Sequence, residues 1–221
     1  ADIPHRADRE AALARVLSRL QARQRRDLLK LLGEPPDLAR VPVEFWRRAE
    51  QDTREETAKH LLAMYLLMAE DLRLPLAPEV IADDGARWAA SQAAIVASQT
   101  TQTSKSWLAD LVGFGRGTRD SVLTVFGPEN GRPANTAATE ITRAASAGER
   151  QTIRRWDTES GTTTETIWKT ELDDLVCPIC RPLQGQSAAA WEHEFPDGPP
   201  AHPSCRCWLE HEITYPDDSE L

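Results

Sequence analysis

The four cysteines of this 221-residue chain all lie near its C-terminal end, in two short pieces. The sequence CPIC holds Cys177 and Cys180, and CRC holds Cys205 and Cys207, with His202 three residues before the second pair. Any crosslink that these side chains form, through a metal ion or through disulfides, is therefore local. A chain of this length can bury roughly 70% of its unfolded surface, so the remainder can form a core without such a crosslink.

The spacing within each pair suits a tetrahedral metal ion. Two thiolates three residues apart can curl around one cation, and the period of two in Cys-Arg-Cys puts both sulfurs on the same side of an extended chain. Sulfur ligands at about 2.3 Å are those that Zn²⁺ prefers. Five candidates, Cys177, Cys180, His202, Cys205 and Cys207, compete for four places, and spacing alone does not select among them. We predict a closed, structural zinc site.

Two alternatives to zinc stay open on the sequence alone. The cysteines can remain reduced or partly ligated in a fold that stands without metal, or form disulfides after exposure to oxidant. No apolar run approaches the roughly 20 residues that span a bilayer, and the N-terminus lacks the apolar stretch of a signal peptide. We therefore expect a soluble protein without membrane contact that is made in the cytoplasm, where paired cysteines hold metal or stay free more often than they form disulfides.

The residues before the cysteines predict three long helices. From about Arg6 to Leu32 apolar residues recur at steps of three and four, and a Gly-Glu-Pro-Pro sequence ends the pattern. A second helix is expected from near Pro42 to about Leu72. A third, from Glu79 to Val112, carries a series of alanines that would let another helix approach closely.

Glycine-rich pieces follow the third helix. The sequence GFGRGT, residues 113–118, lacks the Gly-Lys-Ser/Thr ending of a phosphate-binding loop and follows no strand, so we interpret it as a hinge. After a turn cluster at residues 127–133, a short helix is expected through Ala137 to Ala147, closed by Gly148.

Two strands are expected around the cysteine pairs. The sequence TTTETIWKT, beginning at Thr162, is rich in β-branched and aromatic residues and alternates in polarity. The second strand, Cys205 to Ile213, would place alternate residues on one face, namely Cys205, Cys207, Leu209, His211 and Ile213.

The predicted fold class is α+β and mostly α. Residues 1–112 form a helical partner-docking region, residues 113–159 a hinge and helical connector, and residues 160–221 a small α+β module stapled by the Cys/His cluster.

Charge is distributed unevenly along the chain. The net charge is −9, which argues against a surface that grips nucleic acid throughout. Residues 1–33, however, hold eight basic and four acidic residues, a net +4 that leaves −13 for the rest. We therefore expect only weak, non-specific DNA contact through this basic N-terminal arm, and we expect Trp46, Trp88 and Trp107 to serve core packing.

A catalytic role for the residues near the cysteines is less well supported by the sequence than a structural role. Zinc deaminases place His-x-Glu before Pro-Cys-x-x-Cys, whereas here Glu192-His193-Glu194 follows the CPIC cysteines and the proline lies inside that pair. No His-Glu-x-x-His sequence of a metalloprotease occurs. Glu171, Asp173 and Asp174 could hold magnesium for a nuclease, although a short acidic run is usually a solvated surface. His5, His60 and His211 are interpreted as ordinary surface or half-buried residues.

Three pieces of the C-terminal third resemble the phage Mu protein F-like minor head proteins, also called phage head morphogenesis proteins. The pieces are AATEITRAASAGERQ, IWKTELDDLVCPICRPLQGQ and PPAHPSCRCWL. The matching positions are Thr139, Glu140, Trp168, Thr170, Asp173 or Asp174, Cys177, Cys180, Gly185, Pro200, His202, Pro203, Cys205, Arg206 and Cys207.

This resemblance implies a component of a tailed-phage head or of a prophage-derived particle, made beside the portal protein and assisting head assembly or DNA delivery. It implies a virion location, and the portal or other head proteins as partners. We expect a non-enzymatic role; the alternative is a metal-dependent nucleic-acid enzyme of the packaging machinery. Some family members carry a toxin domain beyond the signature, and we expect none here because the sequence ends 14 residues after Cys207.

Overall fold

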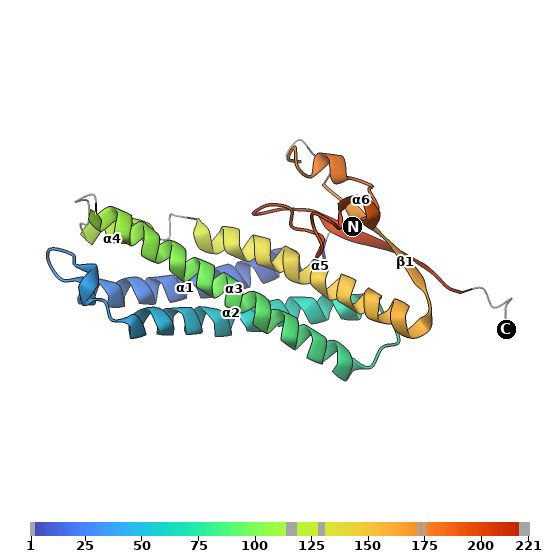
Figure 1. The fold of residues 1–221 in the computed structure, drawn as a ribbon, viewed down its shortest axis with the longest axis horizontal. Coiled ribbons are helices and arrows are strands. Elements are labelled where there is room, and N and C mark those ends of the chain that lie inside the picture. Colours follow the sequence, from blue (N-terminus) through green and yellow to red (C-terminus); the bar gives the residue numbers. More distant parts are fainter. Residues whose placement is uncertain (1–2, 114–118, 128–130, 172, 174–175, 217–221) are drawn as a thin grey trace.

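The computed structural model describes residues 3–113, 119–127, 131–171, 173 and 176–216. Its helices are α1 (Arg6–Leu32), η1 (Leu38–Arg40), α2 (Val43–Asp71), α3 (Pro78–Gly113), α4 (Arg119–Val125), α5 (Arg132–Ser160), η3 (Arg181–Leu183) and α6 (Ala188–Trp191), and its strands are β1 (Thr163–Lys169) and β2 (Trp208–Thr214). Figure 1 shows α1, α2, α3 and α5 lying along one another as an elongated bundle, with the sheet and α6 at one end. The predicted fold class is confirmed.

The first three helices agree closely with the sequence prediction, because each pairs a long apolar period with clear end signals. α1 occupies the predicted Arg6–Leu32, and α2 and α3 begin and end within one residue of their predicted bounds. The main bundle core joins the four long helices through residues such as Leu13, Leu61, Ala93 and Ile141, each fully buried. Among the described residues, no helix is both long and apolar enough to cross a membrane.

The prediction of a short helix ending at Gly148 is wrong. α5 runs without interruption from Arg132 to Ser160, and Gly148 lies in its middle. A Cβ atom at this position would come within 2.4 Å of the backbone oxygen of Tyr65, so the missing side chain serves the close approach of α5 to α2. A glycine at a helix crossing and a glycine at a helix end give the same signal in a sequence.

Helix α4 was not predicted, because seven residues are too few for a clear apolar period. It packs on α3 and α1 at the end of the bundle remote from the sheet, where Val122, Val125 and Phe126 join a second core with Leu28 and Leu108. The predicted hinge and turn fall partly on residues 114–118 and 128–130, which lie outside the described residues.

The sheet consists of β1 and β2 paired antiparallel, with Trp168 opposite Leu209 and Thr166 opposite His211. The first strand is confirmed within one residue at each end. The second begins at Trp208, so the prediction that Cys205 and Cys207 lie in it is wrong; both belong to the loop before it. Leu209, His211 and Ile213 do alternate with exposed residues, as predicted.

The predicted division at residues 112 and 159 stays a prediction. Helix α5, which lies inside the predicted connector, packs along α1 and α2 and also contacts both strands. It is therefore the element shared by the bundle and the C-terminal module, defined here as residues 160–216.

Candidate metal centre

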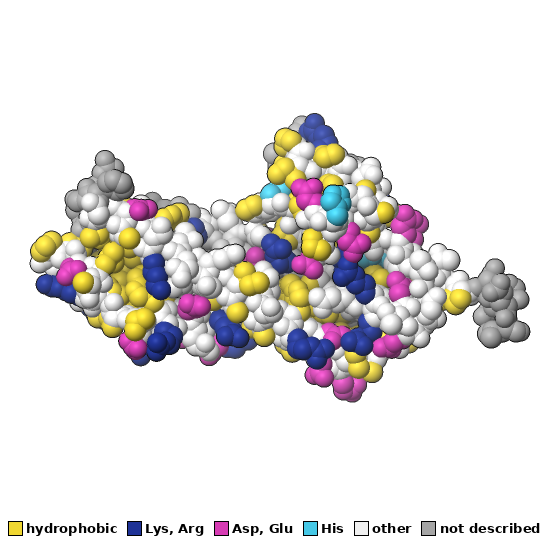
Figure 2. All heavy atoms as spheres, in the orientation of Figure 1, with side chains coloured by type: hydrophobic (Ala, Val, Ile, Leu, Met, Phe, Trp, Pro, Cys, Tyr) yellow, Lys and Arg dark blue, Asp and Glu magenta, His cyan; other side chains and the backbone are white. Residues whose placement is uncertain are grey.

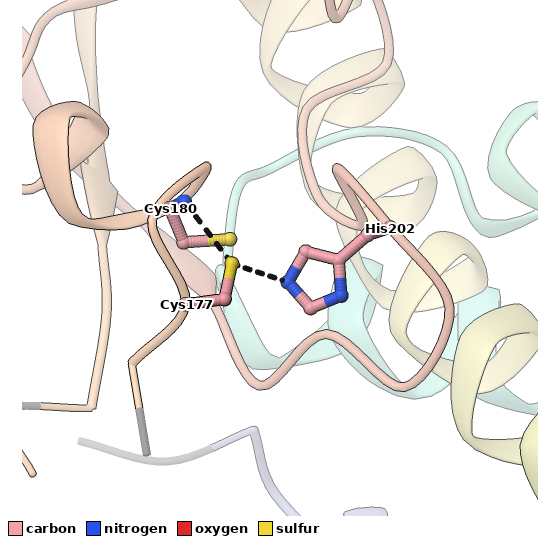
Figure 3. Close-up of side chains that lie close together, drawn as sticks. All are labelled: Cys177, Cys180 and His202. Carbon is pink, nitrogen blue, oxygen red and sulfur yellow. Dashed lines mark hydrogen bonds between the residues drawn. The ribbon is translucent and has the colours of Figure 1, made fainter. Parts of the chain in front are cut away.

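The five predicted ligands meet where two loops of the C-terminal module face each other. Cys177 and Cys180 lie on the loop between β1 and η3, and the other three lie on the loop that leads into β2. Figure 3 shows the side chains of Cys177, Cys180 and His202 pointing toward one another from these two loops. The Cys177 sulfur lies 3.0 Å from His202 Nε2 and accepts a hydrogen bond from the Cys180 amide at 3.3 Å.

The candidate ligands form two groups that share one cysteine. The ligand atoms of Cys177, Cys180 and His202 lie within 4.8 Å of one another, and so do the sulfurs of Cys180, Cys205 and Cys207. Cys180, Cys205 and Cys207 are buried, whereas Cys177 is half-buried. These groups are positioned to hold a metal ion.

The distances fit a small tetrahedral ion. In a tetrahedron whose centre lies about 2.3 Å from each sulfur, neighbouring sulfurs are about 3.8 Å apart. The sulfurs of Cys180 and Cys205 lie 3.7 Å apart. In the described part of the chain all four cysteines are free thiols, so the contact between Cys180 and Cys205 is not a disulfide.

The hydrogen bonding of His202 leaves one ring nitrogen available as a ligand. Nδ1 lies 2.9 Å from the carbonyl oxygen of Pro203. A carbonyl oxygen only accepts, so Nδ1 carries the proton and Nε2 presents its lone pair toward Cys177. A second hydrogen bond of this kind orients metal-binding histidines in general.

The thiols affect one another's ionisation strongly. Hydrogen bonds from Cys180 and Cys207 lower the pKa of Cys205 to about 2, and the hydrogen bond to Cys205 raises the pKa of Cys180 well above its ordinary value. The cluster therefore accommodates one thiolate and resists a second. A bound cation is what would stabilise several thiolates at this spacing.

Residues outside the cluster hold the second loop against the bundle. The carbonyl oxygen of Cys205 accepts hydrogen bonds from Arg6 of α1 at 2.6 Å and from Thr142 of α5 at 3.3 Å. The hydroxyl of Thr139 accepts a hydrogen bond from the Ser204 amide at 3.0 Å. Sequence reasoning missed Arg6 and Thr142, because no local pattern marks a contact across 199 or 63 residues.

The first loop is held against β1. Trp168 exchanges backbone hydrogen bonds with Gln186 and Gly185 at 2.9 and 2.8 Å, and Gly185 takes the left-handed φ of 73° that this turn requires. The amide and hydroxyl of Thr170 both donate to Gln184 Oε1, at 2.6 and 2.9 Å. The fully buried ring of Trp168 packs with the cysteines and with Trp191 in a small core of their own.

The proposed magnesium ligands are not brought together in the described residues. Asp173 accepts two hydrogen bonds from Arg206, at 2.8 and 2.7 Å, and this bidentate ion pair ties one loop to the other. Asp174 lies outside the described residues. Of the single histidines, His5 is exposed, and His211 is half-buried, 3.6 Å from Glu149.

Comparison with protein families identifies the part of the chain that contains this centre. Residues 118–210 match the family described as Phage Mu protein F like protein, a segment that begins just before α4 and ends within β2. The match leaves α1, α2 and α3 outside it. Searches of curated proteins and of solved structures found no match to the chain.

Proposed function

We propose that the protein is a minor head protein of a tailed phage or prophage-derived particle, because residues 118–210 match the phage Mu protein F like family, a family of phage head morphogenesis. Its place is in the virion, where it assists head assembly or DNA delivery without catalytic turnover. The family match carries this proposal. In its support, the signature residues Thr139, Trp168, Thr170 and Gly185 all have structural roles in positioning the two loops.

The metal of the centre is zinc in this proposal. Cysteine sulfur and a neutral histidine nitrogen form the donor set that structural zinc sites use, and Zn²⁺ would supply the positive charge that lets neighbouring thiolates coexist. Cys180 belongs to both groups of candidate ligands, so it is a ligand in every arrangement we consider. Three of the four residues Cys177, His202, Cys205 and Cys207 supply the other places.

The helical part, residues 1–112, docks on the portal protein or another head protein. Three large apolar side chains are exposed in this region, Val43 at 60%, Ile95 at 47% and Trp107 at 43%. Trp107 was expected in the core. Instead, the guanidinium carbon of Arg132 lies over its ring, 4.8 Å from the ring centroid. Exposed apolar side chains on a protein with a basic arm suit an acidic or apolar partner surface.

DNA contact remains weak and non-specific in this proposal. Figure 2 shows basic and acidic side chains interspersed over the visible face of the molecule, which lacks the extended basic surface that a DNA clamp needs. The alternative of a metal-dependent nuclease is not favoured, because the Asp173 carboxylate is engaged by Arg206.

Two measurements test this proposal. Mass spectrometry of purified particles should detect the chain as a minor component, and its absence from particles would contradict a virion role. For docking, the full-length chain is co-purified with the portal protein encoded beside it. Ile95→Asp on α3 should weaken this binding, while Tyr215→Asp, at a 64% exposed position after β2, should leave it unchanged; the reverse result would move the interface to the C-terminal module.

A further inference from the structure

Two hollows follow the line between α1 and α2 on the surface of the bundle. One has a volume of about 370 Å³ and the other about 490 Å³. Arg23 and Asp52, which form an ion pair between the two helices, line both hollows. Half-buried apolar side chains contribute to both linings, among them Leu20 in one and Leu31 and Phe45 in the other. Together the hollows form one groove with a partly apolar floor.

The two walls of the groove carry opposite charges over most of its length. The α1 wall carries Arg19, Arg23, Arg26, Asp27 and Lys30. The α2 wall carries Glu44, Arg48, Asp52, Glu55 and Glu56. Basic residues of α1 lie opposite acidic residues of α2 along most of the groove. At one level the charges are exchanged, with the acidic Asp27 on α1 and the basic Arg48 on α2.

Contacts within the chain show which positions lie at the same level. The Arg23–Asp52 ion pair sets one level, and Gln24 donates to the Ala49 carbonyl at 3.4 Å one turn further along α2 toward its start. The hydrogen bond from Lys59 is the main cause that lowers the pKa of Glu56, and Arg19 adds to it from across the groove. Because α1 and α2 are antiparallel, later positions of α1 lie beside earlier positions of α2.

We infer that this groove is a self-association surface, occupied by the α1–α2 face of a second copy of the chain related by a two-fold axis along the groove. Such an axis lays α1 of each copy on α2 of the other while keeping every position at its own level. Arg19 then faces Glu56 and Arg23 faces Asp52. The four helices form an antiparallel bundle in which the partly apolar floors meet.

The reversed pair of charges supports this axis in particular. At the far end of the groove, Asp27 of one copy would face Arg48 of the other, and Lys30 would face Glu44. A two-fold axis across the helices would instead lay α1 on α1, with Arg19, Arg23 and Arg26 close to their own copies. Like charges in such contact cost on the order of several kcal/mol. The charges therefore favour the axis along the groove over the axis across the helices.

The dimensions of the groove indicate a weak dimer. On α1 the lining runs from Val16 to Leu31, which corresponds to a length of about 24 Å at 1.5 Å per residue. Two helices, each about 10 Å wide, give a contact of roughly 1,000 Å² in total for the two copies, at the lower end of the range for specific complexes. We therefore expect association in the micromolar range that weakens with salt.

Charge reversal of the two walls tests the inference on the full-length chain. Arg19→Glu with Arg26→Glu makes both walls acidic, and Glu55→Arg with Glu56→Arg makes both walls basic. In sedimentation velocity each double variant should associate at least about tenfold more weakly than the wild type, and an equal mixture of the two should associate again. Circular dichroism of each variant checks that the helices are retained.

The control is Arg54→Glu, a reversal at an exposed position of α2 that lines neither hollow, and it should leave association unchanged. A wild-type chain that stays monomeric throughout the micromolar range would refute the inference. So would a mixture of the two double variants that fails to associate, or an Arg54→Glu chain that is as monomeric as they are.

Discussion

The sulfurs of Cys180 and Cys205 lie 3.7 Å apart across two loops that are 25 residues apart in the chain. That separation is close to the distance between neighbouring sulfurs of a tetrahedral zinc site, about 3.8 Å. Cys180 also lies in the group with Cys177 and His202, so it connects both halves of the cluster.

Removal of Cys180 should therefore abolish metal binding. Native mass spectrometry of protein purified from a reducing cytosol should show about one zinc ion per chain. Cys180→Ser should lose it, because the substitution removes the ligand common to both groups. His202→Ala and Cys207→Ser each remove a member of one group only, and the variant with the larger loss of zinc identifies which of the two is a ligand.

Chelation should loosen the C-terminal module while the bundle stays folded. Hydrogen exchange should accelerate between Thr162 and Ile213, since the loops would lose their common anchor, and remain slow in α2 and α3, which have a large core of their own. Unchanged protection of the module after metal removal would argue for a fold that stands without zinc.

The Asp173→Asn substitution separates a structural role from a catalytic one. The side chains of Asp173 and Arg206 are 42% and 39% exposed, so loss of their ion pair should cost no more than about 1 kcal/mol in the free energy of unfolding. Chemical denaturation measures this cost. A magnesium-dependent nuclease activity of the wild type that disappears in Asp173→Asn would instead support the enzyme hypothesis; Glu165→Gln, at an exposed position of β1, is the matched control.

Gly148→Ala should destabilise the bundle. The added Cβ atom would come within 2.4 Å of the Tyr65 carbonyl oxygen, and overpacking of this kind costs about 1–3 kcal/mol. Gly113→Ala at the end of α3 is the control, because its Cβ would meet nothing within 4 Å. Urea denaturation should show a lower midpoint for Gly148→Ala only; equal midpoints would mean that α5 and α2 can move apart at no cost.

Glu149 should make stability depend on pH. Burial raises the pKa of this carboxyl above its ordinary value of 4.5, although the His211 ring, 3.6 Å away, opposes the shift. The folded chain thus holds the proton more tightly than the unfolded chain, so the stability that this group contributes is complete below about pH 4.5 and is lost as the pH rises through the folded pKa. Glu149→Gln should remove this decline, whereas Glu212→Gln, at an exposed position of β2, should retain it.

DNA binding should be weak and independent of sequence. The basic residues of α1 can contact phosphates, but several face acidic residues of α2, as Arg23 faces Asp52. Fluorescence titration with duplex DNA should show binding in low salt that is lost by about 150 mM, where the screening length is about 8 Å. Sub-micromolar, sequence-selective binding at that salt would promote a DNA-contacting role above the structural one.

The start and end of α1, α2 and α3 could be predicted from local signals. A long apolar period with proline or glycine at its ends is typical of one structure, an amphipathic α-helix. The same reasoning failed at Gly148, where the sequence signal of a helix end and of a helix crossing is the same. It failed also at Cys205, because residues of alternating polarity can lie in a loop as well as in a strand when hydrogen bonds from other elements hold them.

By itself the sequence determined the five candidate ligands, since thiol and imidazole side chains at these spacings have few other uses. Only the tertiary structure decided that Cys180 joins two groups, that His202 presents Nε2, and that Asp173 faces Arg206. The charged residues of α1 and α2 could likewise be identified in the sequence, but their alignment across a groove could not be predicted from it. The physical reason is that each of these relationships joins residues far apart in the chain, and their distances depend on how helices and loops pack, which no local pattern encodes.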